Sequence, residues 1–440
     1  KRQAATAALS ACGSGTPGES KEEEGQKDGR TSIEFWHRTF TPVENAWYKK
    51  VTEDFNKAQD KVHVKVTEIP ADAWEQKMKA AQAANKTPDV YTHSGNISDS
   101  VFLSEVHELD SLIDKAILGE INEAGRSVSM YDGTFYAFPL LMEPQAVLFW
   151  NKDMFKAAGL DPEKAPTSWE ELYAMCDKIK PTLQKGQYAI SCAGDADTFA
   201  WATVGQQVNF SGHNALTDDW TKPNIEDDGY VALINAYKTL WDRGFMPKQP
   251  LAPYVEAKDF GQQKVAFKVS GSWMMSEIGS DYKELLDKTG LAPFPSKDGK
   301  PKDKTSTLGN FKWVIDAKSK NAQAAADFIS WALGGDPKIL LPFFEDTQFT
   351  KAPVREKVTE ELSKSTKAEN APWHTVITED IAPYFVDEPL YPWDVSRAVG
   401  LAIEKGIRGT KSPQDALKEA SGTIQKVIDR EKLPKKAPKK

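Results

Sequence analysis

Apolar and polar positions after residue 30 follow two spacings in turn. Val62 and Val64 alternate with polar or charged neighbours, which is the pattern of a strand with one buried face. Upstream, Trp47, Val51 and Phe55 recur at the spacing of one helix face. The full pattern predicts strands at residues 33–36, 62–69 and 89–91 and helices at residues 43–58 and 72–85.

Alternating strands and helices predict an α/β lobe with a largely parallel sheet. Ligands of such sheets bind at the carboxyl ends of the strands. The residues that follow the first and third strands are therefore candidate ligand contacts: His37, Arg38, Phe40, His93, Ser94 and Asn96. For His37 or His93 taken alone, a structural role is at least as common as a ligand contact. Because the two histidines follow adjacent strands, we expect at least one of them to contact ligand.

Length and composition indicate more than one lobe and a site rich in aromatic residues. At about 150 residues per domain, 440 residues predict two or three lobes. The net charge of -8 argues against binding to nucleic acid. The chain also has 13 Trp, 20 Phe and 12 Tyr. Trp supplies a large flat apolar face with one hydrogen-bond donor at its edge, so a ligand with apolar faces would suit it.

The three cysteines do not form a disulfide framework. Cys12, Cys176 and Cys192 allow at most one bridge within the chain. For Cys176 and Cys192, two separately buried thiols are favoured over a bridge, which stays possible outside the cell. With at most one bridge available, the sequence predicts a body stabilised by packing. Separately, no run reaches the about 20 apolar residues that span a bilayer.

The first residues resemble the end of a bacterial lipoprotein signal. Leu9, Ser10 and Ala11 precede Cys12 as in a lipobox, in which the cysteine becomes diacylated. The resemblance implies a truncated signal at residues 1–12, lipidation of Cys12 and a protein anchored in the membrane on the outer, extracellular face. Two acyl chains suffice for stable attachment. A chance cysteine in a leader is the alternative.

Polar segments flank the predicted fold at both ends. Residues 13–30 lack large apolar side chains and are rich in Gly, Ser, Glu and Lys, which predicts a disordered tether. Residues 431–440 form a basic tail, and we expect its lysine run, residues 435–440, to be solvated.

A central block combines several turn and capping signals. Asp132-Gly133 predicts a hairpin turn, and Gly159 predicts the end of a short helix. Thr167 or Ser168 is the expected cap of the next helix. The complete block comprises residues 131–139, 146–153, 155–160 and 165–172.

This block resembles the extracellular solute-binding proteins of bacterial ABC sugar importers, the family that contains the maltodextrin-binding protein. The shared pattern is D-G-x-x-Y-x-x-P, a strand, Y-N-K-D, G-L and P-x-T-W-E-E-L. Trp150 departs from it, since the family usually has Tyr there. Residues 33–37, 265–273 and 319–328 also resemble the family, in its order.

The resemblance implies an α/β fold of the two-lobe periplasmic-binding-protein type (type II), with ligand in the cleft between the lobes. Lobe one is expected to hold residues 31–142 and 311–350, and lobe two residues 143–310 and 351–430. The three hinge crossings are expected near Glu143, near Asn310 and at residues 350–355. Ligand binding would then close the two lobes on each other.

The resemblance also implies site residues suited to a sugar, which needs aromatic faces for its rings and polar side chains for its hydroxyls. Trp273, preceded by Ser272, and Trp393 match stacking tryptophans of the family. Trp201 or its neighbour Phe199 is expected to face the cleft from lobe two. Further candidates are Glu143 and Asn310 at the crossings. A core role for each Trp and a solvated role for Glu143 are the alternatives.

Two stretches have no clear family counterpart. Trp373 and His374 form one, and residues 387–391 form the other. Each could line the mouth of the cleft or cover a surface, and the sequence leaves both possibilities open.

Catalytic and metal motifs do not occur in the sequence. The six histidines show no H-x-x-x-H spacing, and C-x-x-C, G-x-S-x-G and the P-loop are missing. We therefore expect no metal, no cofactor, no catalytic residue and no enzyme activity. A surface glycoside hydrolase, which needs only two carboxylates across a cleft, and a glycan-adhesion lipoprotein are the alternatives.

The functional prediction is a monomeric lipoprotein that captures a neutral oligosaccharide and delivers it to the permease subunits of an ABC importer. Several aromatic residues suit several rings better than one. A xylo-oligosaccharide or arabinoxylo-oligosaccharide is preferred over gluco- or galacto-oligosaccharides. Arg38 leaves an acidic substituent possible.

Overall fold

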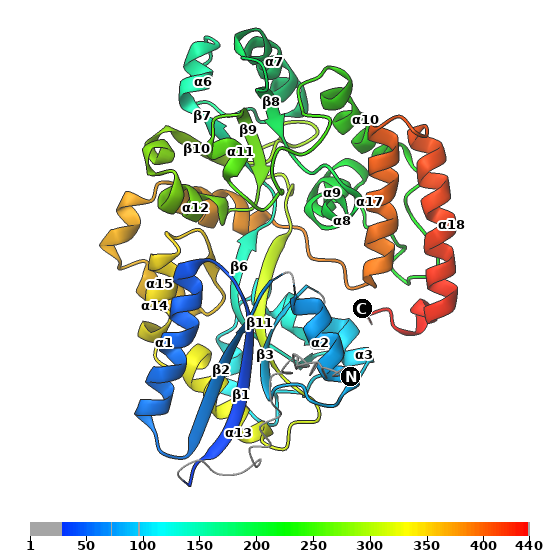
Figure 1. The fold of residues 1–440 in the computed structure, drawn as a ribbon. Coiled ribbons are helices and arrows are strands. Elements are labelled where there is room, and N and C mark those ends of the chain that lie inside the picture. The colour runs from blue at the N-terminus through cyan, green and yellow to red at the C-terminus, as the bar shows by residue number, and fades with distance from the viewer. Residues whose placement is uncertain (1–28, 72, 96, 439–440) are drawn as a thin grey trace, which may run out of the picture.

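The chain forms two lobes, each built on its own sheet (Figure 1). The structure is a computed structural model that describes residues 29–71, 73–95 and 97–438. The larger sheet, in lobe one, has the spatial order β12 (Ala352–Pro353), β6 (Phe138–Pro144), β11 (Leu308–Ile315), β3 (Val90–Ser94), β1 (Thr31–Arg38) and β2 (Val62–Ile69). The smaller, in lobe two, has the order β10 (Thr289–Pro293), β7 (Val147–Asn151), β9 (Val265–Ser270) and β8 (Tyr188–Ser191).

Both sheets mix parallel and antiparallel pairs. In lobe one, β1 is parallel to β2 and to β3, while β11 is antiparallel to β3 and β6. In lobe two, β7 is antiparallel to β9 and β10, and β8 is parallel to β9. The predicted α/β class and the two-lobe arrangement are therefore confirmed.

Helices cover both sheets, and their apolar faces form the cores. The helices of lobe one are α1 (Pro42–Ala58), α2 (Trp74–Ala83), α3 (Ile97–Phe102), α4 (Lys115–Gly119), α5 (Glu123–Ser129), α13 (Ala322–Ile329), α14 (Leu341–Asp346) and α15 (Glu356–Leu362). Those of lobe two are α6 (Lys152–Ala157), α7 (Trp169–Ile179), α8 (Ala196–Ala202), α9 (Val204–Ser211), α10 (Asp228–Asp242), α11 (Lys258–Gly261), α12 (Met274–Asp281), α17 (Trp393–Ile407) and α18 (Pro413–Glu431). Short α16 (Trp373–Thr375) lies in the last connection between the lobes.

The predicted amphipathic helix α1 shows how sequence leads to packing. Its capping box joins Thr41 to Glu44, and the Thr41 hydroxyl donates to Glu44 Oε2 over 2.6 Å. The face that carries Trp47 packs against the sheet, where Phe35 of β1 lies 4.5 Å from the Trp313 ring. This aromatic core fixes α1 on lobe one.

The local signals of the central block are confirmed. Asp132 and Gly133 both have positive φ, 49° and 82°, in the turn between β4 (Met130–Tyr131) and β5 (Thr134–Phe135). Ser168 caps α7 by accepting from Glu171 N, and Gly159 follows α6 with φ 70°. Cys176 and Cys192 are buried and unbridged in lobe two, as the favoured alternative expected.

The chain crosses between the lobes three times, but not where all three crossings were expected. The first lies between β6 and β7, and the second lies between β10 and β11. Asn310 is within β11 and pairs with Met142, so it belongs to the sheet of lobe one. The third crossing follows α15 rather than residues 350–355, because β12 pairs with β6 and α15 packs on α14 and β12.

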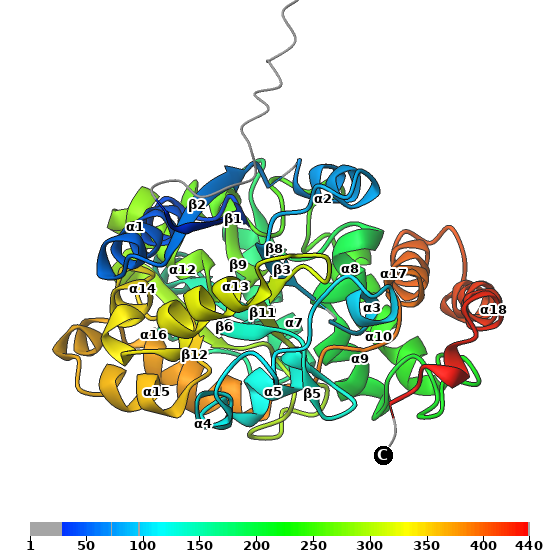
Figure 2. The same cartoon turned by 90° about the horizontal axis from the view of Figure 1, so that it is seen from below.

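The basic tail is held to the fold in part, although Lys435 is exposed as expected for its lysine run. After α18, Leu433 is fully buried in the core of lobe two. The carbonyl of Lys436 then accepts a hydrogen bond of 3.2 Å from Tyr131 of lobe one, and Lys436 Nζ lies 5.1 Å from the Phe102 ring centroid. Figure 2 shows this end of the chain beside α3 and α18. An apolar residue within a basic run thus secures part of the tail.

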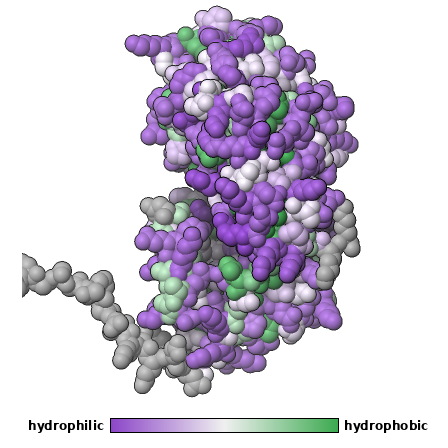
Figure 3. Space-filling view, turned by 90° about the vertical axis from the view of Figure 1, so that its right-hand side faces the viewer, coloured by the Kyte–Doolittle hydropathy of each residue, from purple (hydrophilic) through white to green (hydrophobic). Residues whose placement is uncertain are grey.

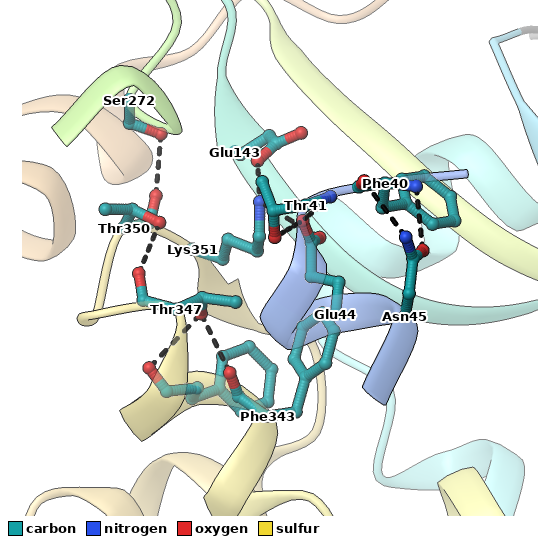
Figure 4. Close-up of polar contacts among 11 residues, drawn as sticks. Phe40, Thr41, Glu44, Asn45, Glu143, Ser272, Phe343, Thr347, Thr350 and Lys351 are labelled. Atoms are coloured by element: carbon teal, nitrogen blue, oxygen red, sulfur yellow. Dashed lines mark hydrogen bonds and ion pairs between the residues drawn. The ribbon is translucent and has the colours of Figure 1, made fainter. Parts of the chain in front are cut away.

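A buried ion triad joins elements at the hinge (Figure 4). Lys351 Nζ lies 2.5 Å from Glu143 Oε2 of β6 and 3.4 Å from Glu44 Oε1 of α1. The three residues are 3–5% exposed. Burial lowers the pKa of Lys351, but the two carboxylates outweigh it and hold the pKa above its usual value. A charge removed from water needs such partners.

Lobe two attaches beside this triad. The Ser272 hydroxyl donates to the Thr350 carbonyl over 2.6 Å (Figure 4). In addition, Ser272 N donates to the Pro144 carbonyl over 3.0 Å. Both acceptors belong to segments next to Lys351 or Glu143. The position of lobe two therefore depends on backbone that the triad holds in place.

Removing the cation should destabilise the protein strongly. We expect Lys351→Met to lower the free energy of unfolding by about 3–5 kcal/mol, because two buried carboxylates lose their shared partner. Equilibrium unfolding in urea measures the change. Lys364→Met is the matched control, since its ion pair with Glu361 is exposed; the urea midpoint of that variant should stay close to that of the wild type. Equal losses in the two variants would contradict the assigned role of the triad.

Candidate functional site

A cavity of about 740 Å³ lies between the two lobes. Lobe one contributes α2, the end of β3 and α3, and lobe two contributes α8, the start of α17 and residues 388–391. Gln145 and Thr307, from the first two crossings, complete the wall. Figure 3 shows the surface indented between the lobes, on the side of α17 and α18. Cavities of this size bind small molecules and oligomers of a few units.

The wall from lobe one begins at the carboxyl end of β3, as the sequence predicted. His93 Nε2 lies 3.1 Å from Ser100 Oγ, and Ser100 donates onward to Glu105 Oε2 over 3.2 Å. Burial, assisted by the charge of Lys312, lowers the pKa of His93 to about 3. His93 is therefore neutral at pH 7. With the Ser100 proton directed to Glu105, the bonding pattern assigns the ring proton of His93 to Nε2.

This His, Ser and Glu chain does not have the arrangement of a catalytic triad. In such a triad the carboxylate accepts from one ring nitrogen of the histidine, and the other nitrogen accepts the serine proton. Here Ser100 lies between His93 and Glu105 and gives its proton to the carboxylate. The arrangement orders a polar wall and does not activate a nucleophile.

The wall from lobe two carries two tryptophans on neighbouring helices. Trp201 lies at the end of α8, and Trp393, which is 45% exposed, begins α17. The helices approach closely at Gly400, where a Cβ atom would lie 2.1 Å from the Ala196 carbonyl oxygen. Glycine at this contact therefore sets how near the two indole rings can lie. Leu103 of lobe one, also exposed, lines the same cavity.

Negative charge predominates around the cavity. Four carboxylates line it, together with one lysine, Lys79. Burial and then Glu431 raise the pKa of Asp99 to about 6. The lining carboxylates belong to Glu75, Asp99, Glu105 and Glu388. With His93 neutral, the site offers many acceptors to a ligand and few cations.

A partly buried polar network links the cavity to the crossing strands. Glu388 accepts from Asn310 Nδ2 and from Gln145 Nε2, each over 3.0 Å. Lys312 Nζ donates to the Gly95 carbonyl over 2.6 Å and to Asn310 Oδ1. Burial lowers the pKa of Lys312 to about 8. The network contains groups from both lobes, so it connects the cavity to the hinge.

Some sequence-predicted site residues line this cavity. They are Trp201, Trp393, His93 and Ser94. Asn310 reaches it only through its hydrogen bond to Glu388. Asn96 and Cys12 lie outside the described residues.

Other predicted contacts lie elsewhere, for identifiable physical reasons. Phe199 is 1% exposed in the core of lobe two, 5.7 Å from the Tyr237 ring, because its side of α8 faces inward. His37 is buried and stacks on Tyr48 at 4.4 Å, which is the structural alternative. Glu143 is neither solvated nor open to the cavity, because it pairs with Lys351.

The remaining predicted residues lie around the hinge. Arg38 packs against the rings of Phe40 and Phe311, with its guanidinium carbon 5.9 and 5.8 Å from their centroids. Trp273 donates to the Val255 carbonyl over 3.0 Å, and its ring lies 6.4 Å from that of Trp201. Trp273 thus supports a cavity residue from behind, and Ser272 bonds Thr350.

Several residues that line the cavity were not predicted from the sequence. Trp74 and Glu75 begin α2, shortly after β2, so the strand-end argument applied to β2 would have found them. Glu388 and Tyr391 fall in the stretch left undecided. No sequence feature marks Gln145 as a cavity residue, apart from its position at a crossing between the lobes. Trp373, by contrast, is buried and donates to the Gln348 carbonyl.

Two absences apply to the described part of the chain. Within residues 29–71, 73–95 and 97–438, no group of three or more His, Cys, Asp or Glu side chains could hold a metal ion. Over the same ranges, no helix is both long enough and apolar enough to cross a bilayer.

Comparisons with known proteins agree with this architecture. The chain is 27% identical over 326 residues to the sn-glycerol-3-phosphate-binding periplasmic protein of Escherichia coli K12, covering 67% of this chain and 68% of that protein. It is 22% identical over 327 residues to the arabinooligosaccharide-binding protein of Bacillus subtilis 168, covering 72% of each.

A solved structure shares the fold, and a family model matches most of the chain. The cyclic α-maltosyl-1,6-maltose binding protein of Arthrobacter globiformis superposes with a TM-score of 0.74 at 23% identity, over 91% of this chain and 100% of that one. The model for bacterial extracellular solute-binding proteins matches residues 50–372. The chain therefore belongs to the bacterial extracellular solute-binding proteins.

Proposed function

We propose that this protein is the binding component of an ABC importer and captures a neutral oligosaccharide between its lobes. The observation that carries the proposal is the interlobe cavity with Trp201 and Trp393 in its wall. Indole faces suit the C–H faces of sugar rings, while the carboxylates, amides and hydroxyls around them suit the ring hydroxyls. Walls from both lobes allow binding to be coupled to closure.

The charges of the cavity favour a neutral sugar over a phosphate ester. The two named relatives differ in this respect, since one binds sn-glycerol 3-phosphate and the other an arabino-oligosaccharide. A phosphate site relies on cationic or backbone N–H donors, above all arginine. Here Lys79 is the one lysine among four lining carboxylates, and Arg38 packs against the rings of Phe40 and Phe311 at the hinge. The oligosaccharide is therefore the better match.

Among neutral sugars, a xylo-oligosaccharide or arabinoxylo-oligosaccharide is the ligand we propose. The relative from Bacillus subtilis, whose named ligand is built from a pentose, supports this choice. Two indole platforms in one cavity support a ligand of more than one ring.

Cellular placement belongs to the same proposal. Cys12 would carry the lipid, and residues 13–30 would give the monomeric body reach from the outer membrane face to the permease subunits. The family is extracellular, which supports this placement. The protein would bind its sugar without chemical change, and the order of His93, Ser100 and Glu105 supports that part.

Calorimetric titration of residues 31–440 tests the function. The panel comprises xylotriose, arabinotriose, maltotriose, mannotriose and sn-glycerol 3-phosphate. We expect a trisaccharide to bind with a Kd in the micromolar range or below, and the phosphate ester at least 100-fold more weakly. Chromatography after the titration should recover the sugar intact. Tight phosphate binding would overturn the ligand class, and shortened products would identify a hydrolase.

Alanine substitution tests the two tryptophans of the wall from lobe two. Trp201→Ala and Trp393→Ala should each weaken trisaccharide binding by about 1–3 kcal/mol, because a face on which the sugar stacks is lost. Trp241→Ala is the matched control: this tryptophan on α10 lies under Lys248, whose Nζ is 4.0 Å from its ring, outside the cavity. Its affinity should equal that of the wild type. If all three variants bind equally, the cavity is not the sugar site.

A further inference from the structure

Glu388 is a half-buried carboxylate in the cavity wall that is held by amides and by no direct ion pair in the described part of the chain. Its Oε1 accepts from Gln145 Nε2 and its Oε2 from Asn310 Nδ2, both over 3.0 Å. Lys312 acts on it only at longer range, through Asn310. Burial raises the pKa of Glu388, and Lys312 and the two amides oppose that effect.

The orientation of this carboxylate is fixed from behind. Asn310 is held through its Oδ1 by Lys312, which is fully buried and also bonds the Gly95 carbonyl. Gln145 is held through its Oε1 by the Thr307 hydroxyl over 2.6 Å. Each amide therefore has its oxygen occupied and only its N–H groups to offer. The carboxylate cannot turn without breaking these hydrogen bonds.

The carboxylate still has capacity to accept hydrogen bonds. Its two oxygens provide about four acceptor positions, and the two amides fill one on each oxygen. Once a ligand displaces water from the cavity, an acceptor that stays unfilled costs free energy, whereas one bonded to a hydroxyl does not. About one free position on each oxygen matches two donors a few ångströms apart. Adjacent hydroxyls of a sugar ring are such donors.

We propose that Glu388 accepts hydrogen bonds from two adjacent hydroxyls of the bound sugar and so determines which sugars the cavity takes. This inference rests on the proposed function and adds a specificity-determining residue to it. The two donors that orient Glu388 come from the first crossing and from β11, so the same contact links ligand hydroxyls to the hinge. A ligand without a hydroxyl pair at this place leaves the carboxylate partly unsatisfied.

The test combines Glu388→Gln with deoxygenated sugars. The probe is the trisaccharide of the panel that the wild type binds most tightly, together with its monodeoxy derivatives. For the parent sugar, Glu388→Gln should weaken binding about 10- to 150-fold, the range for hydrogen bonds to a charged group. In the wild type, removing either of two adjacent hydroxyls should cause a similar loss. In Glu388→Gln, the same deletions should cost less than 3-fold.

Glu34→Gln is the matched control. It removes one charge by the same chemical change, but Glu34 is exposed on β1 and does not line the cavity. It should change parent-sugar affinity less than 3-fold and leave the deoxy penalties intact. Glu388→Asp, which keeps the charge on a shorter arm, should retain more affinity than Glu388→Gln. Urea unfolding of each variant reports whether the fold is kept.

The outcomes separate the two levels of the proposal. A deoxy penalty that disappears only in Glu388→Gln supports the direct contact. Unchanged deoxy penalties in that variant would overturn the inference while leaving the proposed function standing, since Glu388 would then act through structure or charge alone. If the wild type binds none of the trisaccharides, the proposed function fails, and the inference fails with it.

Discussion

The structure depends on how the protein compensates charge where its chain passes between two sheets. Lys351 is buried at the hinge with Glu143 from the first crossing strand and Glu44 from the helix of lobe one. An ion removed from water is tolerated only with close partners. Because those partners lie on separate elements, satisfying one charge fixes β6, α1 and the approach to β12 together. Ser272 then ties lobe two to the adjoining backbone.

The same constraint positions the cavity wall, through a second buried lysine. Lys312 also lies fully buried on β11, and its Nζ is satisfied by Gly95 at the end of β3 and by Asn310. The residues that meet the ligand space are thus positioned by groups that never reach it. In the wall from lobe two, close packing rather than a buried charge positions the residues. Gly400 lets α17 and α8 approach and brings Trp393 and Trp201 to one cavity.

The sequence predicted the elements better than the contacts, and the residues show why. Periodicity located β1, β2, β3 and α1, and strand-end reasoning located His93 and Ser94, because both arguments use local spacing. His37 follows the same rule but stacks in the core on Tyr48. Which side of α8 faces inward, and hence Trp201 rather than Phe199, depends on helices from residues 228–242 and 393–407. Glu388 depends on pairings across 78 and 243 positions of sequence, which local patterns do not contain.

Overall similarity therefore constrains the fold more tightly than the ligand. A sequence identity of 27% with a glycerol-phosphate-binding protein is taken over 326 residues, most of which lie away from the cavity. The cavity is lined by few side chains, and exchanging three or four of them changes its charge without disturbing either sheet. In this chain the carboxylates outnumber the single lining lysine, and a phosphate would meet them with no hydrogen to donate. Those few residues distinguish one ligand class from the other, because the rest of the chain would fold in the same way around either ligand.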